Sequence, residues 1–238
     1  MKIALLGYGK MGKEIEKIAV SRGHEIVLKI NVDNAHELTV DNFKKADAAI
    51  EFSTPETAYS NIQKCFEANV PVVVGTTGWL HKIEEVKNSA TNEGKGFFYA
   101  SNFSIGVNVF FEINKKLAQL MAPYKEYSIE MEEIHHTQKL DAPSGTAITL
   151  AEGIMENNTR KSKWVNDTTT TDNELEIISK RIENIPGTHT VVYNSSIDEI
   201  YIRHTAHNRQ GFALGAVVAA EFMKGKSGFY GMNDLLKF

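Results

Sequence analysis

The sequence lacks the features that mark secreted, membrane-spanning and disulfide-stabilised proteins. Cys65 is the one cysteine among 238 residues, so no internal disulfide can form, and this pattern is typical of a reducing compartment. No apolar run approaches the roughly 18 to 20 residues that cross a bilayer, because Glu221 interrupts the longest candidate, residues 213–223. The first residues show no charged region followed by an apolar core and a cleavage site, which predicts no export signal. We therefore expect a cytoplasmic protein that does not enter a membrane.

An excess of positive charge is also missing. The formal net charge is −4, and no run of Lys and Arg is dense enough to bind phosphate backbones non-specifically. We therefore expect no nucleic-acid partner. Hydrophobic residues make up 42% of the chain and charged residues 24%, which is typical of ordinary folded domains, and the length allows two of them.

Strand-like and helix-like segments alternate in the first half of the chain. Short β-branched or aromatic runs occur at residues 2–6, 25–30, 47–52, 70–74 and 96–100. Helical patterns lie between them at residues 12–22, 55–68 and 79–92. This alternation predicts an α/β fold in which helices cover a Rossmann-like parallel sheet, the architecture of dinucleotide-binding domains.

The pattern changes after residue 105. Apolar residues recur at helical spacing between Val109 and Met121, and Pro123 ends this segment. Strand-like stretches then follow at residues 126–136, 173–183, 187–194 and 197–207, with one helix at 144–157 and a polar stretch at 158–172 that we expect to be a surface loop. A last helix is expected at 213–224. The sequence thus predicts a dinucleotide-binding domain, residues 1–104 and 213–238, and an α+β substrate domain, residues 105–212, with a mixed or antiparallel sheet.

The segment that follows the first predicted strand has the pattern of a phosphate-binding loop. Gly7, Gly9 and Gly12 form G-x-G-x-x-G between a strand and a helix, which is the context that the motif requires. Such glycines let the backbone turn and approach a pyrophosphate at a helix N-terminus. The alternative is that they only make a turn. We expect a dinucleotide to contact Gly7, Tyr8, Gly9, Lys10, Met11 and Gly12.

An acidic residue lies where the dinucleotide ribose is usually bound. Asp33 follows the second strand, about 20 residues beyond the glycine loop, where a carboxylate can bond both ribose hydroxyls and favours NAD over its 2′-phosphate. Lys10 could instead supply a positive charge to a 2′-phosphate. At this point the choice of cofactor stays open.

Three further loops follow predicted strands and could meet the nicotinamide, because ligands of open parallel sheets lie beyond the carboxyl ends of the strands. These loops are residues 52–55, 75–78 and 100–103. For residues 75–78, a plain strand-to-helix turn is an equally good interpretation on spacing alone. From the loops at residues 75–78 and 100–103 we expect the following residues to contact the cofactor: Gly75, Thr76, Thr77, Ala100, Ser101, Asn102 and Phe103.

Residues 133–147 contain the densest collection of reactive groups in the chain. Ser144, Gly145 and Thr146 would lie at a helix N-terminus, where unpaired amides and hydroxyls can bind a carboxylate, so we expect an anionic substrate. His135 and His136 would point to opposite faces of a regular strand and could not chelate one metal ion, so no metal site is expected. The alternative interpretation is a capped helix after a polar strand with solvated histidines.

These residues resemble a known family, 4-hydroxy-tetrahydrodipicolinate reductase, also called dihydrodipicolinate reductase, of the diaminopimelate route to lysine. The family pattern His-His-x-x-Lys-x-Asp-Ala-Pro-Ser-Gly-Thr-Ala is intact from His135 to Ala147. Further matching segments are residues 75–78, 101–108, 187–190 and 227–232. The match covers nearly the whole chain.

The resemblance implies an NAD(P)H-dependent oxidoreductase that reduces 4-hydroxy-tetrahydrodipicolinate to tetrahydrodipicolinate. It implies that His135 is the acid–base residue, that Lys139 is the proton donor, and that His136 with Gly145 and Thr146 binds the carboxylates of a small dicarboxylate substrate. It also implies a homotetramer, with the second domain forming the contacts between subunits.

Two departures from the family pattern bear on the cofactor. The glycine loop is shorter than the usual form, and Asn34 stands where an Arg often follows the acidic residue, so recognition of a 2′-phosphate is in doubt. We predict a preference for NADH over NADPH, with Lys10 as the counterargument. The alternative from another class is a non-catalytic NAD(H)-binding redox sensor, which would not need Lys139.

Overall fold

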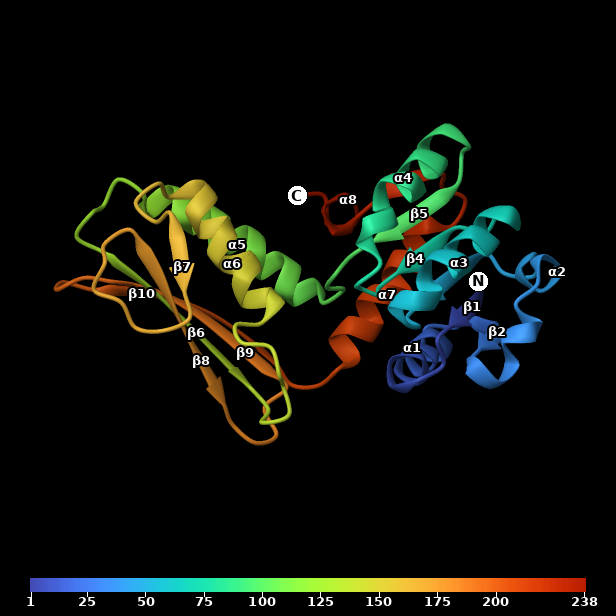
Figure 1. Ribbon diagram of the computed structural model, residues 1–238, viewed down its shortest axis with the longest axis horizontal. Coiled ribbons are helices and arrows are strands. Elements are labelled where there is room, and N and C mark those ends of the chain that lie inside the picture. Colours follow the sequence, from blue (N-terminus) through green and yellow to red (C-terminus); the bar gives the residue numbers. More distant parts are fainter. The chain divides into compact units, whose positions relative to one another are not determined.

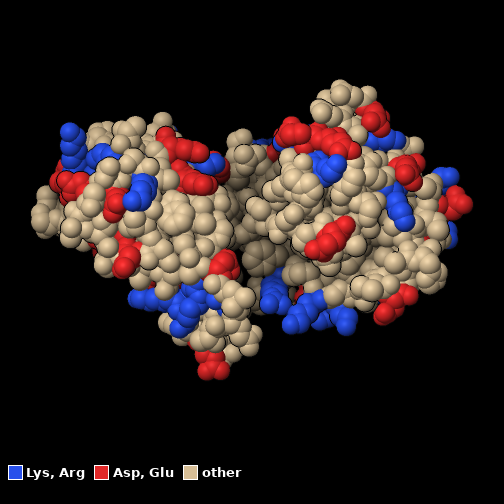
Figure 2. All heavy atoms as spheres, viewed as in Figure 1, with Lys and Arg blue, Asp and Glu red and all other residues tan.

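The computed structural model describes residues 1–238 and divides the chain into two compact units. Unit 1 consists of Met1–Ile105 and Arg209–Phe238, and unit 2 is the continuous segment Gly106–Asn208 (Figure 1). None of the helices has the length and apolar character needed to span a bilayer. On the face of each unit that Figure 2 shows, acidic and basic side chains both occur.

Unit 1 is built on a six-stranded parallel sheet with the strand order β2-β1-β3-β4-β5-β11. The strand order reverses at β1, because β2 lies on one side of it and β3 lies on the other. The loop after β1 is therefore at a topological switch point, where open α/β sheets bind their ligands. The strands are β1 (Lys2–Leu6), β2 (Glu25–Ile30), β3 (Ala48–Glu51), β4 (Val72–Val74), β5 (Gly96–Tyr99) and β11 (Gly228–Tyr230).

Helices cover both faces of this sheet, which is why its central strands are uniformly buried and apolar rather than alternating with polar residues. Ile3 and Leu5 face a core formed with α1 (Lys10–Ser21), α7 (Gln210–Met223) and α8 (Met232–Leu236). Ala4 and Leu6 face a second core, formed with α2 (Val40–Phe43), α3 (Pro55–Glu67) and α4 (Ile83–Asn92). The predicted Rossmann-like parallel sheet is confirmed.

Several short elements of unit 1 differ from the expectation. Residues 228–230, for which the sequence predicts no strand, form β11, which pairs with β5. Residues 79–92 do not form one helix, because a short 3₁₀ helix, Leu80–Lys82, precedes α4. A further 3₁₀ turn, Val32–Glu37, follows β2.

Unit 2 has a five-stranded mixed sheet with the order β10-β9-β6-β8-β7. Strands β6, β8 and β7 run parallel to one another, whereas β9 runs antiparallel to both of its neighbours. Two helices, α5 (Ile105–Met121) and α6 (Gly145–Asn157), pack through apolar side chains on one face only. The strands are β6 (Ser128–His135), β7 (Lys163–Val165), β8 (Glu174–Arg181), β9 (Gly187–Asn194) and β10 (Glu199–Ala206).

The predicted second α+β domain is confirmed, with one correction. Residues 158–172 are not wholly a loop, because Lys163–Val165 adds an edge strand to β8. Three residues within a polar, threonine-rich stretch carry too little β signal to be recognised locally. Pairing with β8 determines the conformation of this segment.

Candidate active site

The three motif glycines of unit 1 have different reasons to be glycine. Gly7 has a φ of +91°, and a Cβ atom there would lie 2.1 Å from the carbonyl oxygen of Phe52. A Cβ on Gly12 would lie 2.4 Å from the Gly7 carbonyl oxygen. Both positions therefore need glycine for the turn itself. A Cβ on Gly9 would meet no atom of the chain within 4 Å, so this glycine leaves open space at the loop.

Helix α1 begins beside this open space without a cap. Gly9 is its N-cap residue, no side chain accepts a hydrogen bond from its first turn, and no acidic residue lies in that turn. Free amides and the positive end of the helix dipole therefore remain available to an anion. The open Gly9 and the uncapped helix have room and charge for an anion such as a pyrophosphate, and contact of Gly7 to Gly12 with a dinucleotide stays a prediction.

The end of β2 holds its polar groups in local interactions, with Asp33 as the exception. The Asn34 side chain accepts a hydrogen bond from the Asn31 amide at 2.7 Å and donates one to the Lys29 carbonyl at 2.8 Å. The Lys29 ammonium lies 2.6 Å from Glu16, which also accepts a hydrogen bond from the Tyr8 hydroxyl. Asp33 is exposed in the 3₁₀ turn.

The other predicted cofactor residues follow β4 and β5 and therefore lie at the same edge of the parallel sheet as the glycine loop. Gly75 packs against the Phe52 ring, where a Cβ would lie 2.2 Å from a ring carbon. Thr76 is buried, with its carbonyl bonded to the Trp79 indole nitrogen at 2.7 Å, whereas Thr77 is exposed. Ala100 and Phe103 are buried, Asn102 is partly buried, and Ser101 and Lys10 are exposed.

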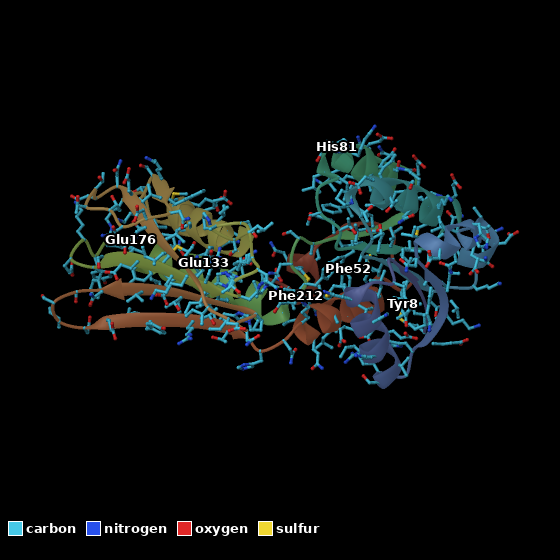
Figure 3. The ribbon with its side chains drawn as sticks, turned by 60° about the horizontal axis from the view of Figure 1, so that its bottom comes forward. Tyr8, Phe52, His81, Glu133, Glu176 and Phe212 are labelled. Atoms are coloured by element: carbon cyan, nitrogen blue, oxygen red, sulfur yellow. The ribbon has the colours of Figure 1, made fainter.

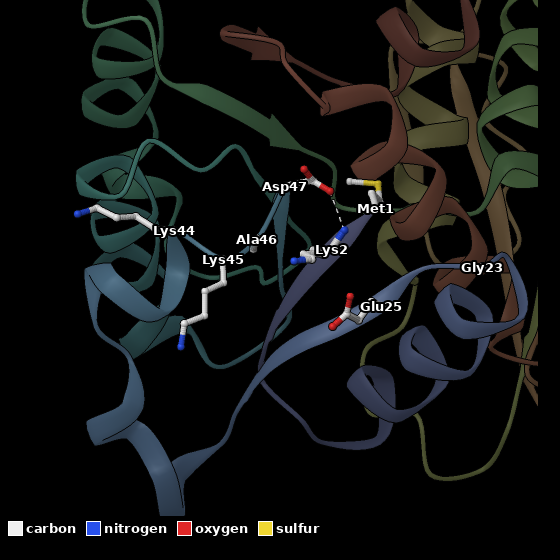
Figure 4. A pocket seen from close by; sticks show the side chains of 8 residues that line it. All are labelled: Met1, Lys2, Gly23, Glu25, Lys44, Lys45, Ala46 and Asp47. Atoms are coloured by element: carbon white, nitrogen blue, oxygen red, sulfur yellow. Dashed lines mark hydrogen bonds between the residues drawn. The ribbon is translucent and has the colours of Figure 1, made fainter.

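An open pocket of unit 1 lies at the opposite edge of the sheet (Figure 4). It is lined by residues at the starts of β1 and β2 and before β3, and Asp47 accepts a hydrogen bond from the Lys2 amide at 2.7 Å. In Figure 4 the Lys44 and Lys45 side chains point in different directions. The pocket therefore offers no converging set of cations and is separate from the glycine loop.

In unit 2 the central polar residue is Glu133, which lies in the interior on β6 (Figure 3). Its carboxylate accepts hydrogen bonds from the Ser144 amide at 3.1 Å and from the Ser179 hydroxyl at 2.8 Å. The Arg181 guanidinium lies 3.4 Å away. Burial alone would raise the pKa of the Glu133 carboxyl, but interactions with His189 and Ser144 outweigh burial and hold the pKa well below its ordinary range.

His135 lies two residues further along β6, on the same face. Its Nδ1 atom is 3.4 Å from Glu133, is buried, and makes no hydrogen bond. Burial, followed by repulsion from the neighbouring His189, lowers the pKa of His135 to about 4. The imidazole is therefore neutral near pH 7, and one of its ring nitrogens can accept a proton.

The loop after β6 carries the predicted cation. The Lys139 ammonium lies 2.7 and 2.8 Å from the two carboxylate oxygens of Asp141. Arg181 supports this loop by donating hydrogen bonds to the carbonyls of Lys139, at 3.3 Å, and Asp141, at 2.6 Å. His136 follows directly after β6 and is partly exposed.

Helix α6 begins next to these groups, and the residues at its start differ in burial and in hydrogen bonding. The Ser144 hydroxyl caps the helix by accepting a hydrogen bond from the Ala147 amide at 3.2 Å, and it also bonds His189 at 3.0 Å. Ser144 is buried, so the structure uses it for positioning. Gly145 is exposed, and a Cβ there would meet no atom within 4 Å, as at Gly9. Thr146 is partly exposed beside it.

Glu133, His135 and His189 also have ligand atoms within 4.8 Å of one another, the arrangement of a possible metal cluster. The Glu133 carboxylate, however, already accepts hydrogen bonds from an amide and a hydroxyl and lies beside a guanidinium. A cation there would displace these donors and be repelled by Arg181. The cluster therefore suits proton chemistry better than metal binding.

Sequence reasoning assigned no role to Glu133, Ser179, Arg181 or His189. Strand alternation could have indicated the first, because Ile129 and Met131 share its face and a glutamate at the next inward position needs buried partners. Ser179 and Arg181 come from β8, and only the parallel pairing of β6 with β8 brings them to the site.

The two units together define a class of protein. A parallel sheet with a glycine loop and an uncapped helix is the architecture of dinucleotide-binding domains, and a separate unit has buried acid–base groups beside a helix N-terminus. The chain is a nicotinamide-dinucleotide-dependent oxidoreductase with two domains.

Comparison with known proteins defines the family. The family model described as dihydrodipicolinate reductase, N-terminus, matches residues 1–103, and that described as dihydrodipicolinate reductase, C-terminus, matches residues 106–236. A 4-hydroxy-tetrahydrodipicolinate reductase from Christiangramia forsetii is 54% identical over 99% of this chain and 98% of its own length. One from Clostridium tetani is 35% identical over 99% of this chain and 97% of its own length.

A solved structure agrees with these matches. The dipicolinate-bound dihydrodipicolinate reductase from a Paenisporosarcina species has a TM-score of 0.77 and 25% identity, over 98% of each chain. This chain belongs to the dihydrodipicolinate reductase family. The resemblance inferred from residues 135–147 is confirmed, and the protein is an enzyme of the oxidoreductase class.

Proposed function

We propose that this enzyme reduces 4-hydroxy-tetrahydrodipicolinate to tetrahydrodipicolinate in the diaminopimelate route to lysine, with a reduced nicotinamide dinucleotide as the hydride donor. The observation that carries the proposal is the cluster in unit 2, where buried His135, the ion-paired Lys139 and the open Gly145 lie around the start of α6. These groups can bind an anion and move a proton.

The dinucleotide supplies a hydride when bound, and the residues of unit 1 bind and orient it. The open side of Gly9 lets the pyrophosphate approach the backbone, and the amides of α1 bind its charge. Thr76 and Thr77 after β4, and Ser101 and Asn102 after β5, would contact the nicotinamide end.

The residues of unit 2 bind the substrate and handle the proton. The amides of Gly145 and Thr146, with His136, would bind the carboxylates of the dicarboxylate. The 4-hydroxyl leaves as water, the hydride is added at C4, and Lys139, held by Asp141, would deliver the proton to the adjacent ring carbon. His135, neutral near pH 7, would exchange protons with the substrate.

We infer that NADH is preferred over NADPH. Three features support this preference: the exposed carboxylate of Asp33, the use of Asn34 to hold the turn after β2, and the ion pair that engages Lys29 with Glu16. The Asp33 carboxylate would repel a 2′-phosphate. The other two features leave the 2′-phosphate without a cation to pair with. Lys10, exposed at the start of α1, is the one basic residue in the loop that could oppose the preference.

We also propose a cytoplasmic homotetramer in which the second domain forms the subunit contacts. The face of the unit 2 sheet opposite α5 and α6 carries Ile134, Ile178 and Val192 without a covering helix. A partner subunit would bury these apolar side chains. Light scattering of the purified protein measures the oligomeric state, and a monomer would contradict it.

The decisive experiment supplies freshly generated 4-hydroxy-tetrahydrodipicolinate to the purified protein and follows nicotinamide oxidation. We expect turnover by the wild type and losses of roughly 10²-fold or more in kcat for His135→Ala and Lys139→Ala. Glu156→Gln, at an exposed position near the far end of α6, is the matched control and should retain activity. Dinucleotide binding without any turnover by the wild type would reject the reductase and favour a redox sensor.

A further inference from the structure

Unit 1 contains a buried carboxyl group that the proposed chemistry does not use. Glu51 is the last residue of β3, at the sheet edge where the cofactor loops begin, and it is fully buried. Its neighbours on the adjacent strands are Leu6 on β1 and Val74 on β4. A glutamate between two aliphatic side chains in the middle of a parallel sheet is costly, so its contacts should have a purpose.

The two oxygens of Glu51 have different surroundings. Oε1 accepts hydrogen bonds from the Ser53 amide at 3.1 Å, from the Ser53 hydroxyl, and from the Asn61 amide group at 3.3 Å. Oε2 is buried and makes no hydrogen bond. The Thr76 hydroxyl oxygen is likewise buried and makes no hydrogen bond, although it is close enough to the Glu51 carboxyl to lower the pKa of that group.

Besides Asn61 on α3, the Glu51 carboxyl contacts Ser53 and lies near Thr76, and both of these residues belong to loops proposed to bind the dinucleotide. Ser53 follows β3 and Thr76 follows β4, and the Trp79 indole fixes the Thr76 carbonyl from the other side. We propose that Glu51 is a positioning residue for the dinucleotide site, holding Ser53 through Oε1 and Thr76 through a proton on Oε2. The inference rests on the proposed cofactor site.

A neutral carboxylic acid agrees with the electrostatics of the site. Glu51 takes part in no ion pair, and burial, partly offset by the Ser53 and Thr76 hydroxyls, raises the pKa of its carboxyl above the ordinary value. Helix α3 brings one titratable group, the buried Cys65 thiol, whose pKa burial also raises, so Cys65 stays neutral. The strands β1 and β4 bring only Leu6 and Val74.

Direct binding of NADH, measured by its fluorescence without substrate, tests the proposal. Glu51→Ala should raise the Kd for NADH by about tenfold, the effect of losing one or two hydrogen bonds that hold the loops. Glu51→Gln keeps a donor and an acceptor and should bind within about threefold of the wild type. Glu84→Gln, at an exposed position on α4, is the control.

The pH dependence separates positioning from simple support of the fold. Wild-type affinity for NADH should weaken as the pH is raised and Glu51 ionises, whereas Glu51→Gln should show no such loss. Equal affinity of Glu51→Ala and the wild type, or a Glu51→Gln variant as weak as Glu51→Ala, would overturn the proposal. If Glu51→Ala does not fold, the pH profiles of NADH affinity for the wild type and Glu51→Gln decide, and identical profiles would overturn the proposal. A wild type that binds neither NADH nor NADPH would instead reject the proposed cofactor site.

Discussion

Replacing Glu133 by alanine should destabilise unit 2 strongly. The change removes a fully buried carboxylate and leaves the Ser144 amide, the Ser179 hydroxyl and the Arg181 guanidinium without their acceptor. Each hydrogen bond to a charged group contributes about 1.5–3 kcal/mol, and breaking a buried pair costs about 3–5 kcal/mol. Because the same donors enter both counts, we expect a loss of about 3–5 kcal/mol in the free energy of unfolding.

Urea unfolding followed by tryptophan fluorescence measures this loss. Each unit carries one tryptophan, Trp79 in unit 1 and Trp164 in unit 2, so a Trp164→Phe background reports unit 1 alone and should hide the effect. The matched control is Glu112→Ala, whose side chain forms a partly exposed ion pair with Lys115 on α5 at 2.7 Å. That pair should contribute about 0–1 kcal/mol. A Glu133→Ala variant no less stable than Glu112→Ala would refute the reasoning.

The same network predicts how stability depends on pH. The pKa of Glu133 is lower in the folded state than its ordinary value of 4.5, so its contribution is present above pH 4.5 and is lost as the pH falls through the folded pKa. His135, whose pKa falls from 6.5 to about 4, takes up a proton more readily when unfolded. Stability should therefore fall from pH 6.5 to about 4, and His135→Asn should reduce this slope in acid unfolding curves.

Four further variants test the two sites. Gly9→Ala should keep wild-type stability but weaken NADH binding by about tenfold or more, whereas Gly7→Ala, with its φ of +91°, should unfold more easily by about 1 kcal/mol or more in urea. Asp141→Asn releases Lys139 from its ion pair, so kcat should fall. The Kd for NADH should stay the same, because the proposed NADH site is in unit 1. Glu16→Gln frees Lys29, so the ratio of kcat/KM for NADPH to that for NADH should rise, and an unchanged ratio would show that Lys29 has no influence on cofactor choice.

Most of the fold could be predicted from local sequence patterns. The alternation of strands and helices, the context of the glycine loop and the polar segment 135–147 are each contained in a short stretch of sequence. The candidate sites could be predicted for the same reason, because Gly9 and Gly145 lie at the starts of helices that short stretches of sequence predict.

The missed features depend on pairing between distant segments. Strand β7 exists because β8 lies beside it, and β11 because β5 presents an edge. Arg181 reaches Glu133 across two strands that are paired in parallel, and Thr76 approaches Glu51 from the next strand of the sheet. One sequence shows which polar residues are present, but it does not show which of them share a buried contact.

The position of α7 and β11 has a consequence for the order in which the two units can be completed. Unit 2 is one continuous segment, so its internal contacts lie within residues 106–208. Unit 1 is incomplete without residues 209–238, because Gly215 of α7 must pack against the backbone of Phe103, and β11 supplies the last strand. Until those residues have packed, much of one apolar face of the sheet formed by residues 1–105 stays uncovered, and the chain should then be most prone to aggregation.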